Sequence, residues 1–172
     1  MTAPVALDTS PASGGQDACA SALRTIETEA AGLAILKAAL GNGLSEPFAR
    51  AVATIASARG RVIVTGVGKS GHVGAKIAAT LASTGTPASF VHATEASHGD
   101  LGMITDNDVV LALSGSGETQ ELAATIAYTR RFKVPLVAIT SRSESALGTA
   151  ADIVLALPKV EEACPHGLAP TT

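Results

Sequence analysis

Five short apolar runs of strand length, separated by stretches with helical periodicity, constrain the fold of this chain more than any other feature. They cover residues 61–65, 88–92, 109–113, 136–140 and 153–157. Strands that alternate with helices pair in parallel and are joined by right-handed crossovers. The run at 109–113 is wholly apolar, which is typical of a strand buried on both faces. The sequence therefore predicts an α/β fold, a flavodoxin-like, doubly wound sheet of five parallel strands with helices on both faces.

Helices are expected around these strands, from apolar residues spaced three and four apart. They run over about 23–40, 45–59, 72–84 and 120–133, with a short helix after Ser143. Residues 41–43 end the first helix, and Ser45 is the expected cap of the second. Residues 93–108 are expected to form a polar connection that contains glycine.

The first strand leads into a glycine-rich turn at residues 66–72, Gly-Val-Gly-Lys-Ser-Gly-His, which is called the glycine turn below. Its glycines permit positive φ and let backbone N–H groups approach a ligand, and the next helix directs the positive end of its dipole there. Gly68 lies in the turn beside Lys69 and Ser70, which add a positive charge and a hydroxyl group. The turn is predicted to bind an anion such as a phosphate group.

A second polar loop, residues 114–119, follows the third strand and is called the hydroxyl loop below. Ser114, Ser116 and Thr119 supply hydroxyl groups at another helix N-terminus. In a sheet ordered 2-1-3-4-5, the first and third strands are neighbours where the winding reverses, which opens a ligand crevice. The two loops would then converge on one phosphate compound. The sequence alone leaves the strand order open.

Two nucleotide-binding motifs match the glycine turn only in part. The dinucleotide pattern also needs an acidic residue at the end of the next strand, about 20 residues on. That position holds His92. Residues 68–70 resemble the end of a P-loop, but the glycine required five positions before residue 68 is Ile63. A phosphate monoester therefore fits these loops better than a nucleotide does.

Composition argues against several classes of protein. The chain has 172 residues, a net charge of -3 and 2% aromatic residues, which disfavours a nucleic-acid binder. Cys19 and Cys164 are too few for a disulfide framework and are interpreted as reduced thiols. No apolar run is long enough to cross a bilayer, and the N-terminus lacks a secretory pattern. We expect a cytoplasmic protein without nucleic-acid or membrane partners, with a flexible tail at residues 1–15 and one domain at 16–172.

Five segments together resemble the sugar isomerase (SIS) domain of the arabinose 5-phosphate isomerase family. They are the glycine turn, residues 82–87 (Ala-Ser-Thr-Gly-Thr-Pro), residues 95–103 (Glu-Ala-Ser-His-Gly-Asp-Leu-Gly-Met), the hydroxyl loop, and residues 162–171 (Glu-Ala-Cys-Pro-His-Gly-Leu-Ala-Pro-Thr). The glycine turn and hydroxyl loop are shared by all SIS domains, whereas residues 98–102 and 163–165 are narrower signatures. The resemblance spans most of the chain after residue 60.

The resemblance implies interconversion of D-ribulose 5-phosphate and D-arabinose 5-phosphate through an enediolate, which supplies the lipopolysaccharide sugar KDO. Such a reaction needs a base that carries a proton and a positive group that stabilises the developing oxyanion. The resemblance singles out Lys69, Glu121 and Glu162 as catalytic residues, with His98 lining the site. Lys69 is the expected electrostatic group and Glu162 the expected base, although several groups could act as the base.

The same residues also allow simpler structural interpretations. A carboxylate at Glu121, in the first turn of a helix, ordinarily complements the helix dipole. Glu162 follows another glutamate in a loop, a pattern that is more often a solvated rim. His92 and His98 lack a clear metal-ligand spacing and would ordinarily be hydrogen-bonded loop residues.

The resemblance also implies substrate contacts and a metal. Gly85 and Thr86 match contact positions although they precede a strand, at the other end of the sheet, which contact across a subunit interface would explain. Zinc at His92 would be inhibitory or incidental, because an enediolate route requires no metal cofactor. The predicted substrate-binding residues, from both arguments, are Gly68, Ser70, Gly85, Thr86, His92, Ser114, Ser116 and Thr119.

The chain departs from the family in two respects. The family commonly carries asparagine where this chain has Gly115. Family members continue beyond the equivalent of residue 172 with a catalytic histidine and usually a pair of CBS modules, so we expect an SIS domain truncated at its C-terminus. The resemblance also implies a homotetramer. A noncatalytic sugar-phosphate-binding SIS module and a dinucleotide-binding domain are the alternatives.

Overall fold

The computed structural model describes residues 11–168, with side chains from residue 17. The chain divides into two units, one of Ala39–Pro158 and one of Met1–Ala38 with Lys159–Thr172. The second unit contains most of α1 (Pro11–Leu40) and a C-terminal segment without helix or strand over residues 159–168. Residues 1–10 of the expected tail lie outside the described range, and residues 11–15 are the first residues of α1. Within residues 11–168, no helix is long and apolar enough to span a bilayer.

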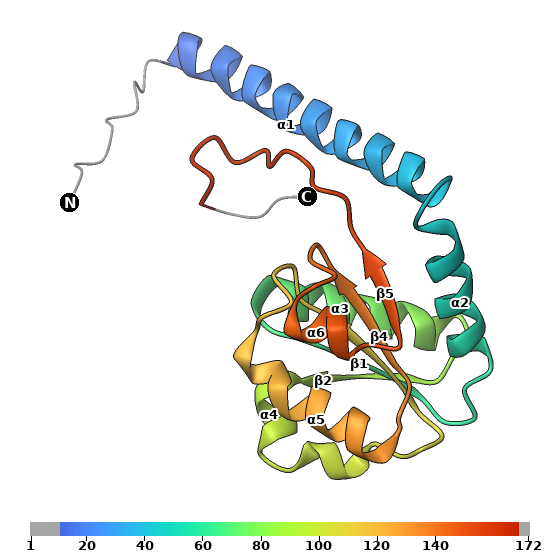
Figure 1. Cartoon of the computed structure of the whole chain (residues 1–172). Helices are drawn as coiled ribbons and strands as arrows, with labels where there is room; N and C mark the ends of the chain where they lie inside the picture. Colours follow the sequence, from blue (N-terminus) through green and yellow to red (C-terminus); the bar gives the residue numbers. More distant parts are fainter. Residues whose placement is uncertain (1–10, 169–172) are drawn as a thin grey trace. The chain divides into compact units, whose positions relative to one another are not determined.

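The unit Ala39–Pro158 is built on a five-stranded sheet in which every pairing is parallel. Its order is β2-β1-β3-β4-β5, as a doubly wound sheet of this class requires (Figure 1). The strands are β1 (Val62–Gly66), β2 (Ala88–His92), β3 (Val109–Leu113), β4 (Leu136–Thr140) and β5 (Ile153–Ala156). All five strands therefore lie where the apolar runs predicted them, within one residue at each end.

Helices cover both faces of this sheet, as the sequence predicted. On one face lie α2 (Ser45–Ala56) and α3 (Gly68–Ser83), whose apolar residues pack with Val62 and Val64 of β1. On the other face, α4 (Ala93–Ser97), α5 (Ala123–Phe132) and α6 (Ala146–Ala150) pack with Ile63, the residue between those two valines. Alternate residues of a strand point to opposite faces, so a continuous apolar run serves both layers.

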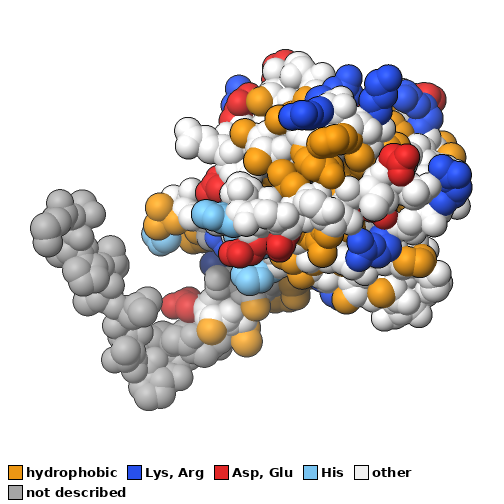
Figure 2. All heavy atoms as spheres, turned by 90° about the horizontal axis from the view of Figure 1, so that it is seen from below, with side chains coloured by type: hydrophobic (Ala, Val, Ile, Leu, Met, Phe, Trp, Pro, Cys, Tyr) orange, Lys and Arg blue, Asp and Glu red, His pale blue; other side chains and the backbone are white. Residues whose placement is uncertain are grey.

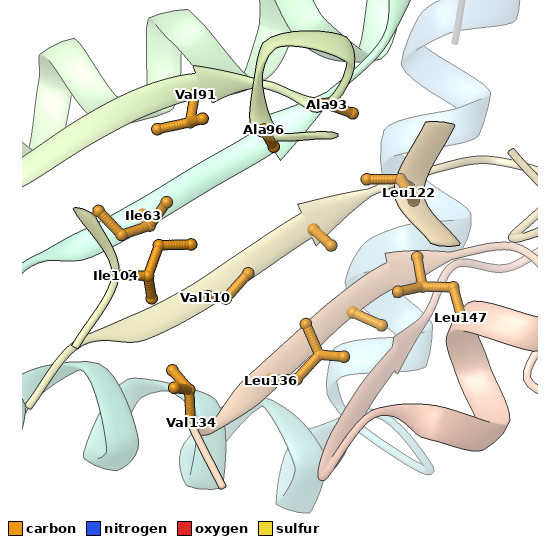
Figure 3. Close-up of a cluster of buried hydrophobic side chains, with 12 residues drawn as sticks. Ile63, Val91, Ala93, Ala96, Ile104, Val110, Leu122, Val134, Leu136 and Leu147 are labelled. Atoms are coloured by element: carbon orange, nitrogen blue, oxygen red, sulfur yellow. The ribbon is translucent and has the colours of Figure 1, made fainter. Parts of the chain in front are cut away.

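The core between the sheet and α4, α5 and α6 consists of small and medium aliphatic side chains (Figure 3). Val110 and Leu136 of the central strands are 0% exposed, and Leu147 of α6 is also 0% exposed. Burying a side chain of this kind contributes about 1.5 to 3 kcal/mol. The core is thus filled by valine, isoleucine, leucine and alanine, as a chain with 2% aromatic residues requires.

The glycine turn differs from expectation, because α3 begins at Gly68 and not near His72. Within the turn only Gly68 has positive φ, at 58°. The other two glycines permit close packing: a Cβ on Gly66 would lie 3.1 Å from the carbonyl oxygen of Leu113, and one on Gly71 would lie 3.0 Å from that of Gly66. The spacing of the three glycines therefore reflects helix-to-strand packing as much as backbone conformation.

Two further local expectations were wrong. Ser45 is the first residue of α2 and not its cap; the cap position is Leu44, and the Ser45 hydroxyl donates to the carbonyl oxygen of Asn42 at 2.7 Å. The connection at 93–108 is not merely a loop, since it holds α4 and the 3-10 helix η1 (Asp100–Met103). A side chain from the preceding strand starts α4, because Nδ1 of His92 accepts from the N–H of Thr94 at 3.3 Å.

One buried carboxylate fastens the loop that leads into β3. Asp108 is 3% exposed and accepts from the N–H of Arg61 at 2.6 Å and from the N–H and hydroxyl of Thr105 at 2.7 and 3.0 Å. Burial raises the pKa of Asp108, but the hydrogen bonds from Arg61 and Thr105 outweigh burial and leave the pKa below its ordinary value. The ionised carboxylate therefore stabilises the native chain.

We expect Asp108→Asn to lower the free energy of unfolding at pH 7 by about 1 to 3 kcal/mol, because an amide NH2 would face a donor N–H. The stabilisation by Asp108 is complete above the unfolded-state pKa of about 3.9 and is lost as the pH falls through the lower native pKa. The difference between variant and wild type should therefore shrink below about pH 4.

Urea unfolding at several pH values measures this difference. Asp106→Asn is the matched control, because Asp106 is an exposed neighbour whose carboxylate accepts from the side chain of Asn107 at 3.1 Å. A pH-independent deficit in Asp108→Asn, or an equal deficit in the control, would contradict the role assigned to Asp108.

Candidate functional site

The register of the parallel sheet brings the two predicted phosphate loops to the same edge. The last residue of β1, Gly66, pairs with His92 of β2 on one side and with Leu113 of β3 on the other. The glycine turn leaves β1 at this point, and the hydroxyl loop starts directly after β3, at Ser114. This edge is the carboxyl end of the strands at the switch point, where open α/β sheets bind their ligands.

The glycine turn places Lys69 at the second position of α3. Gly68 and Lys69 are exposed and Ser70 is half-buried, so all three positions are accessible from solvent. α3 has 16 residues, and the N–H groups of its first turn have no intrahelical acceptor. An anion bound here would meet these N–H groups, the dipole of the helix and the Lys69 ammonium group.

The hydroxyl loop is held in shape by its own side chains. The hydroxyl groups of Ser114 and Thr119 are 2.8 Å apart, and the N–H of Gly117 donates to the Ser114 hydroxyl at 3.0 Å. The N–H of Glu118 donates to the Ser116 hydroxyl at 3.2 Å. Ser116 is exposed, Thr119 is half-buried and Ser114 is 4% exposed, so the first two are the more accessible donors.

Two glycines of the hydroxyl loop have different roles. Gly117 has φ 67°, and a Cβ there would collide with the Ser145 side chain. At Gly115, by contrast, an added Cβ would meet nothing within 4 Å. The asparagine that the family resemblance implies at residue 115 would therefore fit this backbone, and the glycine leaves open space above the loop.

The hydroxyl loop is held by hydrogen bonds from residues at the end of β4. The sequence interpretation had treated this region only as the end of a strand followed by a short helix. The N–H of Ser141 and the hydroxyl of Thr140 both donate to the carbonyl oxygen of Gly115, at 3.0 and 3.3 Å. Ser145 is the residue before α6 and caps that helix, two residues later than Ser143, after which the sequence predicted a short helix. Its proximity to the hydroxyl loop was not detectable, because more than two dozen residues separate the two segments along the chain.

His92 lies at the predicted edge and pairs in register with Gly66. Its Nδ1 accepts a hydrogen bond, so a neutral ring carries its proton on Nε2, the nitrogen that faces away from Thr94. Among residues 17–168, no three His, Cys, Asp or Glu side chains lie close enough to hold a metal ion together. Zinc at His92, which the family resemblance implied, therefore stays a prediction.

His98 and Glu121 are accessible residues on the connections that follow β2 and β3. His98 is the residue after α4, and its side chain is exposed. Glu121 is also exposed and lies in η2 (Gln120–Leu122), two residues after Thr119 in the chain. Thr119 itself occupies the position before η2, and its carbonyl oxygen accepts from the N–H of Leu122 at 3.1 Å. The first turn of this helical segment thus carries a carboxylate, as expected.

Gly85 and Thr86 do not join this cluster. They follow α3 and precede β2, and the next residue, Pro87, accepts from the N–H of Val62 at the start of β1. Both therefore lie at the amino end of the strands, the edge opposite the glycine turn, as the sequence indicated. Gly85 also has a local structural role, because its φ of 93° lets the chain leave α3.

Glu162 belongs to the other unit of the chain, in the C-terminal segment that follows Pro158. Within this segment Glu162 is exposed, whereas Ala163 and Cys164 are half-buried. The N–H of Gly167 donates to the carbonyl oxygen of Cys164 at 3.1 Å, which closes a turn over residues 164–167.

The edge of the sheet therefore carries the glycine turn with its lysine, a loop of hydroxyl groups and exposed carboxylate and imidazole groups. The acidic residue that would hold a nucleotide ribose is lacking at the end of β2, where His92 stands. This arrangement suits a small phosphorylated compound that carries carbonyl or hydroxyl groups.

Comparison with known proteins identifies the same type of domain. The SIS domain family matches residues 54–172. The arabinose 5-phosphate isomerase KdsD of Yersinia pestis is 56% identical over 135 residues, which cover 78% of this chain and 41% of that protein. The KdsD of Pseudomonas aeruginosa is 50% identical over 152 residues, which cover 88% of this chain and 45% of that protein. The chain thus spans about two-fifths of the length of these curated relatives.

Solved structures agree with the fold. A protein of E. coli CFT073 in complex with arabinose 5-phosphate superposes with a TM-score of 0.81 at 39% identity, covering 91% of this chain and 81% of that one. A Listeria monocytogenes protein superposes with a TM-score of 0.86 at 25% identity, covering 96% and 82% of the two chains. With the five-stranded parallel sheet, the glycine turn and the hydroxyl loop in place, the chain belongs to the SIS domain family.

Proposed function

We propose that this chain is the isomerase domain of an arabinose 5-phosphate isomerase, which interconverts D-ribulose 5-phosphate and D-arabinose 5-phosphate for the synthesis of KDO and lipopolysaccharide. The observation that carries the proposal is the register at Gly66, which sets the Lys69 turn beside the hydroxyl loop. Relatives named as arabinose 5-phosphate isomerases, and a related structure in complex with that sugar phosphate, support the identity of the sugar.

The chemistry of this edge matches the two parts of a sugar phosphate. Ser114, Ser116 and Thr119 offer hydroxyl donors for the phosphate oxygens, and they stand at a helical N-terminus. In the proposed reaction, a base removes the proton on C1 of ribulose 5-phosphate, and the electrons move to the C2 oxygen. The resulting enediolate carries negative charge, which the ammonium group of Lys69 stabilises. The hydroxyl proton then moves from the C1 oxygen to the C2 oxygen as C1 becomes the carbonyl carbon, and return of the first proton to C2 gives the aldose.

We propose Glu162 as the base, with Glu121 and His98 as further catalytic groups. A base for this step needs a lone pair that carries a proton between neighbouring carbons, which carboxylate and imidazole groups both provide. Gly68, Ser70, His92, Gly85 and Thr86 remain proposed substrate contacts. In the proposed route, side chains of the protein carry the proton and stabilise the negative charge of the enediolate, so the route requires no cofactor.

Isotope exchange tests the proposed reaction directly. Purified protein incubated with ribulose 5-phosphate in D2O should produce arabinose 5-phosphate that carries deuterium at C2, because the base exchanges its proton with solvent during the enediolate stage. NMR measures both product and deuterium. Saturable binding of the sugar phosphate without exchange would overturn the catalytic proposal and favour a noncatalytic binding module.

We expect Lys69→Ala to lower kcat by about 10²-fold or more, with little change in the Kd for substrate, because the charge of Lys69 acts on the enediolate. Steady-state kinetics and calorimetry measure the two quantities. Lys76→Ala is the matched control, since Lys76 lies two turns further along α3 and donates to the Thr80 hydroxyl at 3.0 Å. A variant that loses affinity at unchanged kcat would make Lys69 a phosphate anchor only.

We also propose that the protein acts in the cytoplasm as a homotetramer. Support comes from large apolar side chains left exposed on the unit Ala39–Pro158, of which Phe48, Val52 and Val73 are 47, 50 and 53% exposed. Figure 2 shows hydrophobic side chains gathered between charged ones on one face. Light scattering should give about four times the 17.0 kDa of one chain, and a monomer mass at micromolar concentration would refute the assembly.

A further inference from the structure

The hydroxyl loop is attached to α6 by a side chain that has no assigned role. Oε1 of Glu118 accepts from the N–H of Ala146 at 3.0 Å, and the carbonyl oxygen of Gly117 accepts from the N–H of Leu147 at 3.0 Å. The third N–H of this turn, that of Gly148, donates to the Ser145 hydroxyl at 3.2 Å. Two of the first three N–H groups of α6 are thus satisfied by the loop that follows β3.

Glu118 connects α6 to a hydroxyl group that faces solvent. Its carboxylate binds the first N–H of α6, while its own N–H donates to the Ser116 hydroxyl at 3.2 Å. The adjoining residue cannot rearrange freely, because Gly117 has positive φ and lies against the Ser145 side chain. The position of Ser116 is therefore coupled to the bond between Glu118 and Ala146.

The carboxylate of Glu118 is unexpected in a loop that is proposed to bind a phosphate group. A free carboxylate there would repel a phosphate dianion and would lower affinity. A hydrogen bond from the N–H of Ala146 instead holds the side chain toward α6. The glutamate at residue 118 thus has a structural contact despite its unfavourable charge.

We infer that Glu118 is a positioning residue for the phosphate site: its bond to α6 holds the hydroxyl loop in the conformation that presents Ser116 and Thr119 to a phosphorylated ligand. A loop fixed before binding loses less conformational entropy when the ligand arrives. Removing the bond should therefore weaken binding more than it destabilises the fold. This inference rests on the proposed function, which makes the ligand a sugar phosphate.

The test compares Glu118→Ala, which removes the acceptor, with Glu118→Gln, which keeps an acceptor oxygen at the same reach. Calorimetry with D-arabinose 5-phosphate should show binding weakened about two- to tenfold in the alanine variant, the usual range for loss of one hydrogen bond. The glutamine variant should bind within about twofold of wild type. Glu144→Ala is the control, because Glu144 is an exposed carboxylate on the same edge that accepts from the Ser143 hydroxyl.

A second measurement separates positioning from loss of folding. Amide hydrogen exchange at Ala146 should accelerate in Glu118→Ala and stay slow in Glu118→Gln, while the midpoint of thermal unfolding changes little in both. Equal affinity in wild type and Glu118→Ala would overturn the inference, as would equal losses in the alanine and glutamine variants or tighter binding by the alanine variant. A wild-type protein that binds no sugar phosphate would instead overturn the proposed function.

Discussion

The parallel pairing of β1 between β2 and β3 is the constraint on which the rest of the candidate site depends. Gly66 stands between His92 and Leu113, so the three polypeptide segments that leave these strands begin side by side. A parallel ladder cannot slip by one residue without moving every buried side chain to the wrong face. Because Val62, Ile63 and Val64 are buried on alternate faces, the core itself fixes where Lys69 and Ser114 emerge.

The close approach of α3 to β1 is the second requirement. Added Cβ atoms at Gly66 and Gly71 would lie 3.0 to 3.1 Å from carbonyl oxygens, so larger residues would push the helix away from the sheet. The first turn of α3, with Lys69, would then move with it. The same glycines thus serve the packing of the fold and the predicted anion site, which is why a glycine pattern alone distinguishes poorly between ligand classes.

The hydroxyl loop is supported differently, through hydrogen bonds to residues that come later in the chain. Thr140 and Ser141 bind its carbonyl oxygen at Gly115, and the first turn of α6 binds Gly117 and Glu118. The edge of the sheet therefore presents one turn fixed by close packing and one loop fixed by polar contacts. Both hold polar groups still before a ligand binds, which reduces the entropy cost of recognition.

The sequence by itself determined the strands, the layering, the glycine turn and the hydroxyl loop, because these follow from hydrophobic periodicity and from residues adjacent in the chain. Local patterns failed where a competing contact decided the outcome: Ser45 lies inside α2, and His92 starts α4 through its ring nitrogen. Only the tertiary structure decided the strand order and the bond from Glu118 to α6. Contacts between distant residues depend on how the whole sheet is wound, and no spacing in the sequence encodes that winding.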